Sequence, residues 1–185
     1  SNSDIIYIGT GDRDAGNAPG LGVYKTIDGG LTWNPINNSM GNVTVATMLM
    51  HPSNSNIIIA ATKEGIYKTI NGGTTWSLKE SGNFKDLQFK PGDPNVVYAV
   101  KILTPSEFYR SSDTGDNWTQ ITSGIPTSGI GSRMVIGVSA NKSANSDFVY
   151  LLQIKSTDGT FASFLKSTDA GLNFSTVSIA IPGSI

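Results

Sequence analysis

The residues Thr26-Ile27-Asp28-Gly29-Gly30-Leu31-Thr32-Trp33 are the first copy of a motif that occurs four times in this 185-residue chain. The other copies are Thr69-Ile70-Asn71-Gly72-Gly73-Thr74-Thr75-Trp76, Ser111-Ser112-Asp113-Thr114-Gly115-Asp116-Asn117-Trp118 and Ser167-Thr168-Asp169-Ala170-Gly171-Leu172-Asn173-Phe174. A motif that recurs along a chain predicts a repeat architecture, in which each copy belongs to one structural unit.

The residue types of the motif indicate a structural role. The acid or amide at its third position can accept hydrogen bonds from the backbone of the turn that follows. The glycine two positions later permits a positive φ. The aromatic residue then covers the turn with apolar surface. We do not expect one chain to have four active sites built on identical turns. We therefore interpret the acids, the amide and the aromatic residues of the four motifs as structural: Asp28, Asn71, Asp113, Asp169, Trp33, Trp76, Trp118 and Phe174.

The sequence around each motif repeats as well. A short strand precedes each motif, at 23–25, 66–68, 108–110 and 164–166. An apolar run comes before that strand, at 5–8, 57–60, 96–99 and 148–151. Three units have an earlier strand, at 47–50, 86–89 and 134–138, and a last strand starts at each aromatic residue. The runs are short, β-branched and continuous, which predicts strands buried on both faces.

The predicted unit therefore has four strands and roughly 40–45 residues, which is typical of a blade of a β-propeller. We expect an all-β chain that forms a single propeller domain over residues 1–185. The expected blades are residues 1–43, 44–85, 86–130 and 131–185.

The motif resembles the Asp-box, or BNR, repeat of sialidases, tandem-propeller xyloglucanases, sortilin-like receptors and photosystem assembly propellers. The resemblance implies a propeller that usually has six or more blades. The first unit begins without its first strand, so we expect about four blades of a larger ring, with the remaining blades of the parent protein as partners. A closed four-bladed ring is the alternative. Because the same repeat serves enzymes, receptors and scaffolds, it does not specify the function.

The amino-acid composition of the chain limits which classes of binding partner are expected. The formal net charge is −1 and 15% of the residues are charged, so we expect neither a nucleic-acid partner nor a membrane partner. The chain has no cysteine, which excludes disulfides and thiolate zinc sites. Low lysine content, abundant Ser, Thr and Asn, and the resemblance together predict a bacterial protein that is extracellular or on the cell surface.

Candidate functional residues lie in the loops between the second and third strands, where ligands of the resembled family mainly bind. The first such loop is long and contains Asp12, Arg13, Asp14 and Asn17. Asp12 and Asp14 could supply oxygen ligands to calcium, the one cofactor that we consider. Asp12 also follows the second strand of its unit, as a catalytic Asp does in tandem-propeller xyloglucanases. The alternative is a solvated loop held by Asx turns and an Asp–Arg pair.

Two further candidates, Phe84 and Arg133, lie in the connections between units. A triad or a histidine-rich metal site is not expected around His51, the only histidine. We expect a non-catalytic binding or scaffold module for a carbohydrate or protein ligand. The alternative is a fragment of a glycoside hydrolase, either xyloglucanase-like or sialidase-like, whose cleft is completed by further blades.

Overall fold

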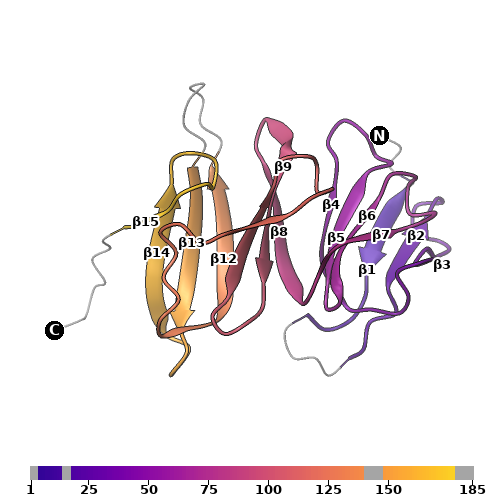
Figure 1. Cartoon of the computed structure of the whole chain (residues 1–185). Helices are drawn as coiled ribbons and strands as arrows, with labels where there is room; N and C mark the ends of the chain where they lie inside the picture. The colour runs from indigo at the N-terminus through magenta and orange to yellow at the C-terminus, as the bar shows by residue number, and fades with distance from the viewer. Residues whose placement is uncertain (1–3, 14–17, 140–147, 178–185) are drawn as a thin grey trace.

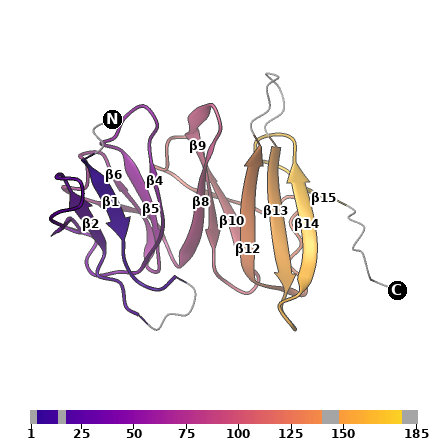
Figure 2. The ribbon, with the colours of Figure 1, turned by 180° about the vertical axis from the view of Figure 1, so that it is seen from behind.

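The computed structural model describes residues 4–13, 18–139 and 148–177, which form four antiparallel sheets that stand side by side in chain order (Figures 1 and 2). We call these sheets blades 1 to 4. Blade 1 contains β1 (Ile6–Gly9), β2 (Val23–Thr26) and β3 (Asn34–Pro35). Blade 2 contains β4 (Val45–Met50), β5 (Ile58–Thr62), β6 (Gly65–Thr69) and β7 (Ser77–Ser81). Blade 3 contains β8 (Phe84–Lys90), β9 (Asp93–Lys101), β10 (Glu107–Ser111) and β11 (Thr119–Ile121). Blade 4 contains β12 (Ile130–Ser139), β13 (Phe148–Lys155), β14 (Phe161–Ser167) and β15 (Ser175–Thr176).

The strand order within each sheet follows the chain, as expected for propeller blades. We label the four positions a, b, c and d, so that β5, β9 and β13 are b strands and β6, β10 and β14 are c strands. Blade 1 has b, c and d strands within the described residues, in agreement with a first unit that begins without its first strand. The third sheet starts at Phe84, earlier than the expected boundary at residue 86.

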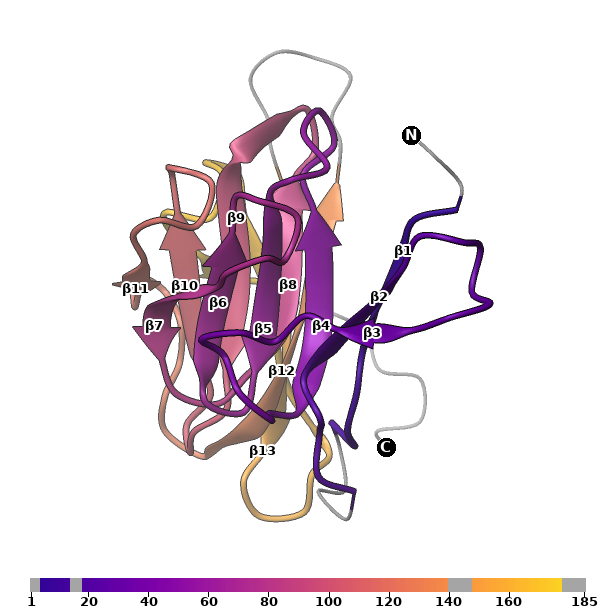
Figure 3. The same ribbon diagram turned by 90° about the vertical axis from the view of Figure 1, so that its right-hand side faces the viewer.

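Burial of the b strands depends on their neighbours. All of β5 and the stretch Val96–Val100 of β9 are buried, as predicted. The prediction of full burial is wrong for β1, whose Ile6 and Ile8 are exposed, and for β13, in which buried and more exposed residues alternate. In the described part of the chain, blades 1 and 4 each pack against one other blade, whereas blades 2 and 3 each pack against two. Figure 3 views the row from its blade 1 end.

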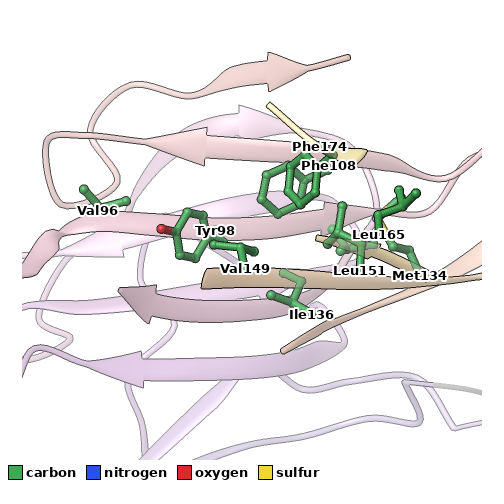
Figure 4. Packing of buried hydrophobic residues seen from close by; sticks show 10 residues of the cluster. Val96, Tyr98, Phe108, Met134, Ile136, Val149, Leu151, Leu165 and Phe174 are labelled. Atoms are coloured by element: carbon green, nitrogen blue, oxygen red, sulfur yellow. The ribbon is translucent and has the colours of Figure 1, made fainter. Parts of the chain in front are cut away.

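The core consists of three clusters, one for each pair of adjacent blades. Figure 4 shows the cluster between blades 3 and 4, where Tyr98 and Phe108 face Val149, Leu151 and residues near them. Tyr98 and Phe108 stack with their ring centroids 5.8 Å apart. The propeller is therefore held together mainly by apolar packing between sheets.

Each motif folds its own turn. In the first copy, the Asp28 carboxylate accepts hydrogen bonds from Thr26 Oγ1 (2.6 Å), Thr32 N (2.9 Å) and Thr32 Oγ1 (2.6 Å). These bonds, that from Thr26 foremost, hold the pKa of Asp28 well below its ordinary value. The same carboxylate-centred turn recurs around Asp113 and Asp169. The structural interpretation of the motif acids follows directly from this geometry.

The amide in the second copy preserves the turn without a charge. Asn71 Oδ1 accepts a hydrogen bond from Thr75 N at 3.0 Å, and Asn71 Nδ2 donates to Thr75 Oγ1 at 2.9 Å. The turn therefore needs the hydrogen-bonding geometry of the side chain more than its ionisation.

Candidate functional site

A groove runs along the rim of the blades where the loops between b and c strands emerge. Two neighbouring cavities of about 400 and 440 Å³ share Arg13, Asn83 and Lys85 in their walls, and we refer to the two together as the groove. The first cavity lies against the long loop that follows β1, and the second lies between blades 3 and 4. This is the rim on which the candidate loops were expected.

The base of the long loop is fixed by hydrogen bonds. Thr10 Oγ1 donates to the Gly22 carbonyl at 2.8 Å, and Asp12 N donates to the Ala18 carbonyl at 3.0 Å. Gly20 lies so close to the backbone of Val43 and Thr44 that any side chain there would collide with it. The loop is thereby held against the next connection, with Asp12 and Arg13 at the groove.

The first cavity places two carboxylates together with cationic side chains. Asp12 and Glu64 both line it, along with Arg13, Lys63 and Lys85. Lys63 and Glu64 form the short turn between β5 and β6, where Glu64 N donates to Thr62 Oγ1 at 3.2 Å and Lys63 N donates to the Thr44 carbonyl at 3.0 Å. The arrangement can bind a ligand that carries groups of both charges.

The second cavity combines a cationic side with an apolar side. Arg13, Lys85 and Arg133 line it together with one carboxylate, that of Asp86. Asp86 Oδ2 accepts a hydrogen bond from Ile136 N at 3.4 Å, so part of its capacity is used by the next blade. The apolar side consists of Val100, Ile102, Met134 and Val135.

The structure brings three of the predicted site residues, Asp12, Arg13 and Arg133, to the same groove. Asp14 and Asn17 lie outside the described residues, so their parts in a ligand or calcium site stay predictions. In the described part of the chain, no three His, Cys, Asp or Glu side chains are grouped so that they could hold a metal ion.

The prediction that Phe84 contacts a ligand is wrong in this structure. Phe84 is the first residue of β8 and is fully buried, with its ring 5.3 Å from that of Tyr109 in an edge-to-face arrangement. Lys101 Nζ lies 5.7 Å from the Phe84 ring centroid. The residue packs blade 3, because the strand starts earlier than its sequence pattern indicated.

Sequence reasoning missed the contributions of Lys63, Asn83, Lys85 and Asp86 to the groove. These residues had no motif to mark them. The available signal was their position: they lie in, or directly beside, the loops and connections that were expected on this rim.

The single histidine lies outside the groove. His51 Nδ1 accepts a hydrogen bond from Ser53 N at 3.2 Å, and its ring lies 6.0 Å from that of Phe89, so the single histidine belongs to a turn. No helix suited in length and apolarity to crossing a membrane occurs in the part of the chain that the structure describes.

Comparison with known proteins identifies a family and a set of related folds. Residues 22–126, more than half of the chain, match the Sortilin-Vps10 family model, described as sortilin, neurotensin receptor 3. An ancestral GH74 enzyme superposes with a TM-score of 0.69 and 25% identity, over 98% of this chain and 23% of the enzyme. No curated protein matches the sequence.

Two other solved structures are similar in fold. The GH74 xyloglucanase of Xanthomonas campestris has a TM-score of 0.65 and 16% identity, over 99% of this chain and 30% of the enzyme. The GH74 enzyme of Niastella koreensis has a TM-score of 0.63 and 21% identity, over 95% of this chain and 28% of the enzyme. The chain thus spans less than a third of these enzymes and matches a portion of larger propeller proteins.

Proposed function

Because the chain belongs to the Sortilin-Vps10 family, we propose that it is a non-catalytic binding module whose rim groove takes a peptide segment of a protein ligand. The family description names a receptor for neurotensin, and receptor function requires recognition without chemistry. We also propose that the module is extracellular or on the surface of a bacterial cell, because the chain is poor in lysine and rich in Ser, Thr and Asn and contains this type of repeat.

One observation carries the choice of a peptide over a glycan. Among the described residues that line the groove, four are cationic and three are acidic, and none is aromatic. Neutral sugars are usually bound by stacking on aromatic rings, whereas a peptide offers charges of both signs, backbone hydrogen-bonding groups and apolar side chains. The apolar side of the second cavity suits an aliphatic side chain next to an anionic group.

The test is a binding measurement with two probes, a random library of short peptides and an array of neutral oligosaccharides. We expect peptides to be enriched. Replacement of Arg13 or Arg133 by Ala should lower the affinity for the enriched peptides by about tenfold or more. The matched control is Asp158→Ala, which removes a charge from the turn between β13 and β14, outside the groove walls. Peptide binding that survives loss of both arginines, or enrichment of oligosaccharides alone, would refute the proposal.

A glycoside hydrolase is the second candidate, for a specific reason. The chain is 25% identical to an ancestral GH74 enzyme, and Asp12 and Glu64 line the same cavity. Glycoside hydrolysis normally uses two carboxyl groups on either side of the scissile bond. In this case the chain would contribute part of a cleft that other blades complete.

Reducing-end release from xyloglucan, measured with the parent protein that contains the further blades, separates the two candidates. If the protein is a hydrolase, we expect it to release reducing ends, and we expect Asp12→Asn to lower the rate by orders of magnitude with the melting temperature unchanged. A binding module predicts no release by the wild type, together with the peptide binding described above.

A further inference from the structure

One dipeptide of the second motif is chemically labile. Asn71 is followed by Gly72, and it is the only asparagine in the sequence that a glycine follows. In an Asn–Gly pair the backbone nitrogen of the glycine can attack the side-chain amide carbon, because glycine has no Cβ to hinder the approach. The other three motifs carry an acid at this position, as Asp28, Asp113 and Asp169. The reaction would therefore change the one amide of the four motifs into the acid that the others have.

The reaction has two steps and needs only water. The Gly72 nitrogen loses its proton and bonds to Cγ of Asn71, and the side-chain nitrogen leaves as ammonia, which produces a succinimide ring. Water then opens the ring. Cleavage of the new bond between nitrogen and Cγ gives aspartate, whereas cleavage of the original peptide bond gives isoaspartate, in which the main chain runs through Cβ. Asparagine and water thus become ammonia and one of these two acids.

The folded turn holds the attacking nitrogen. Gly72 N donates a hydrogen bond to the Asn56 carbonyl at 3.0 Å, and Gly72 itself is buried. The equivalent bond occurs in the first motif, where Gly29 N donates to the Asp4 carbonyl at 3.0 Å. Because the N–H group of Gly72 is bonded in this way, its nitrogen must leave the carbonyl before a base can remove the proton.

The amide of Asn71 is held at both ends. Its Oδ1 accepts hydrogen bonds from Thr69 Oγ1 at 2.9 Å and from Thr75 N at 3.0 Å. Its Nδ2 donates to Thr75 Oγ1 at 2.9 Å. A rotation that brings Cγ to the Gly72 nitrogen would break these bonds, so ring closure requires that the turn opens first.

The main chain of the turn is also confined by the preceding blade. A side chain added at Gly73 would collide with Ile36, and Tyr7 Oη donates to the Gly72 carbonyl at 3.3 Å. An aspartate in place of Asn71 fits this space, since aspartate forms the same turn in the other three motifs. Isoaspartate adds a methylene to the main chain, and the packed turn has no room for it.

We propose that Asn71 is a modification site under the control of the fold. The closed turn blocks deamidation, and an opened turn or an unfolded chain converts Asn71 to aspartate or isoaspartate. The aspartate product refolds into the turn, whereas isoaspartate prevents the second motif from closing. A period of unfolding is thereby recorded in the covalent structure, and the isoaspartate chains are lost from the folded population.

Peptide mass mapping of aged protein tests the inference. The wild type is incubated at mildly alkaline pH, either folded or in guanidinium chloride, and Asn71→Asp serves as the chromatographic standard that separates aspartate from isoaspartate. In the unfolded chain we expect Asn71 to deamidate faster than every other asparagine. In the folded protein the rate at Asn71 should be about a hundredfold or more lower. After return to native buffer, the folded fraction should contain the aspartate product and exclude isoaspartate.

A matched pair of variants locates the control in the turn. Thr75→Val removes the hydroxyl that accepts from Asn71 Nδ2, and it should raise the rate at Asn71 in the folded protein about fivefold. Thr32→Val removes the equivalent hydroxyl of the first motif, which donates to Asp28 at 2.6 Å, and it should leave the rate at Asn71 unchanged. Near-ultraviolet circular dichroism checks that both variants are folded.

Three outcomes would contradict the inference. A folded wild type that deamidates at Asn71 as fast as the unfolded chain overturns it. Equal acceleration by Thr75→Val and Thr32→Val would show that overall stability, and not the turn, controls the reaction. An isoaspartate form that refolds as well as the aspartate form would refute the loss of modified chains.

Discussion

Replacement of Trp76 by Ala is expected to destabilise the fold strongly. Trp76 is 3% exposed and packs in the cluster between blades 1 and 2, against residues such as Val23 and Ile58. Loss of a buried large aromatic side chain costs roughly 3–5 kcal/mol. Trp76 Nε1 also donates to the Ile36 carbonyl of the preceding blade at 2.7 Å, and loss of that donor costs about 1 kcal/mol more. Urea denaturation, followed by circular dichroism, measures the change in the free energy of unfolding.

Trp33→Ala is the matched control for this prediction. Trp33 occupies the same motif position, but it is only partly buried, and its Nε1 donates to Gly30 of its own motif at 3.1 Å. We therefore expect a smaller loss, about 1–2 kcal/mol. If Trp33→Ala and Trp76→Ala destabilise the chain equally, the tryptophan stabilises the motif turn itself, and the argument from packing between blades is refuted.

Three further predictions concern individual side chains. Burial raises the pKa of Asp113, but the hydrogen bonds from Asn117, Ser111 and Asp116 together outweigh this effect and lower the folded-state pKa to about 2. The ionised Asp113 therefore stabilises the fold above the pKa of the unfolded chain, about 4, and this stabilisation is lost as the pH falls toward 2. The urea midpoint of Asp113→Asn should accordingly fall less than that of the wild type between about pH 4 and about pH 2. An equal fall in the two proteins would contradict this. Asp116→Ala should cost about 2 kcal/mol in urea titrations, because it removes the carboxylate from the buried ammonium of Lys68, and the added substitution Lys68→Met should recover much of that loss; no recovery would contradict the explanation. Asp158→Ala, in an exposed turn, should leave the urea midpoint unchanged, and a large shift would show that this turn is structurally important.

The repeated parts of the fold could be predicted from the sequence because each signal is local. The turn around Asp28 is specified by residues within the motif, and the b and c strands by short apolar runs next to it. The same logic overestimated the burial of Ile6 and Ile8. Burial of a b strand depends on whether a further blade lies against it, and that information is not contained in the strand.

The candidate site was predictable only in part. Asp12, Arg13 and Arg133 stood out as charged residues in rim loops, and all three line the groove. Lys85 lines it as well, but nothing in the sequence distinguishes it from other surface lysines. Phe84 was misjudged because an aromatic residue at the start of a strand looks like a loop aromatic until the strand boundary is known.

Polar contacts between adjacent blades have a consequence for how such a chain can change. Tyr7 Oη and Lys25 Nζ of blade 1 donate to the Gly72 carbonyl of blade 2, and Tyr98 Oη and Arg110 Nε of blade 3 donate to the Ala170 carbonyl of blade 4. These bonds lie at the motif end of the sheets, whereas the groove lies at the other end, in loops as different as residues 10–22 and the turn at Lys63 and Glu64. A loop on the groove side can therefore lengthen or shorten while these polar contacts stay intact. A duplicated unit would bring its own donor pair and its own acceptor carbonyl. The chain is thus suited to gaining blades in whole units and to accepting grafted recognition loops on one rim.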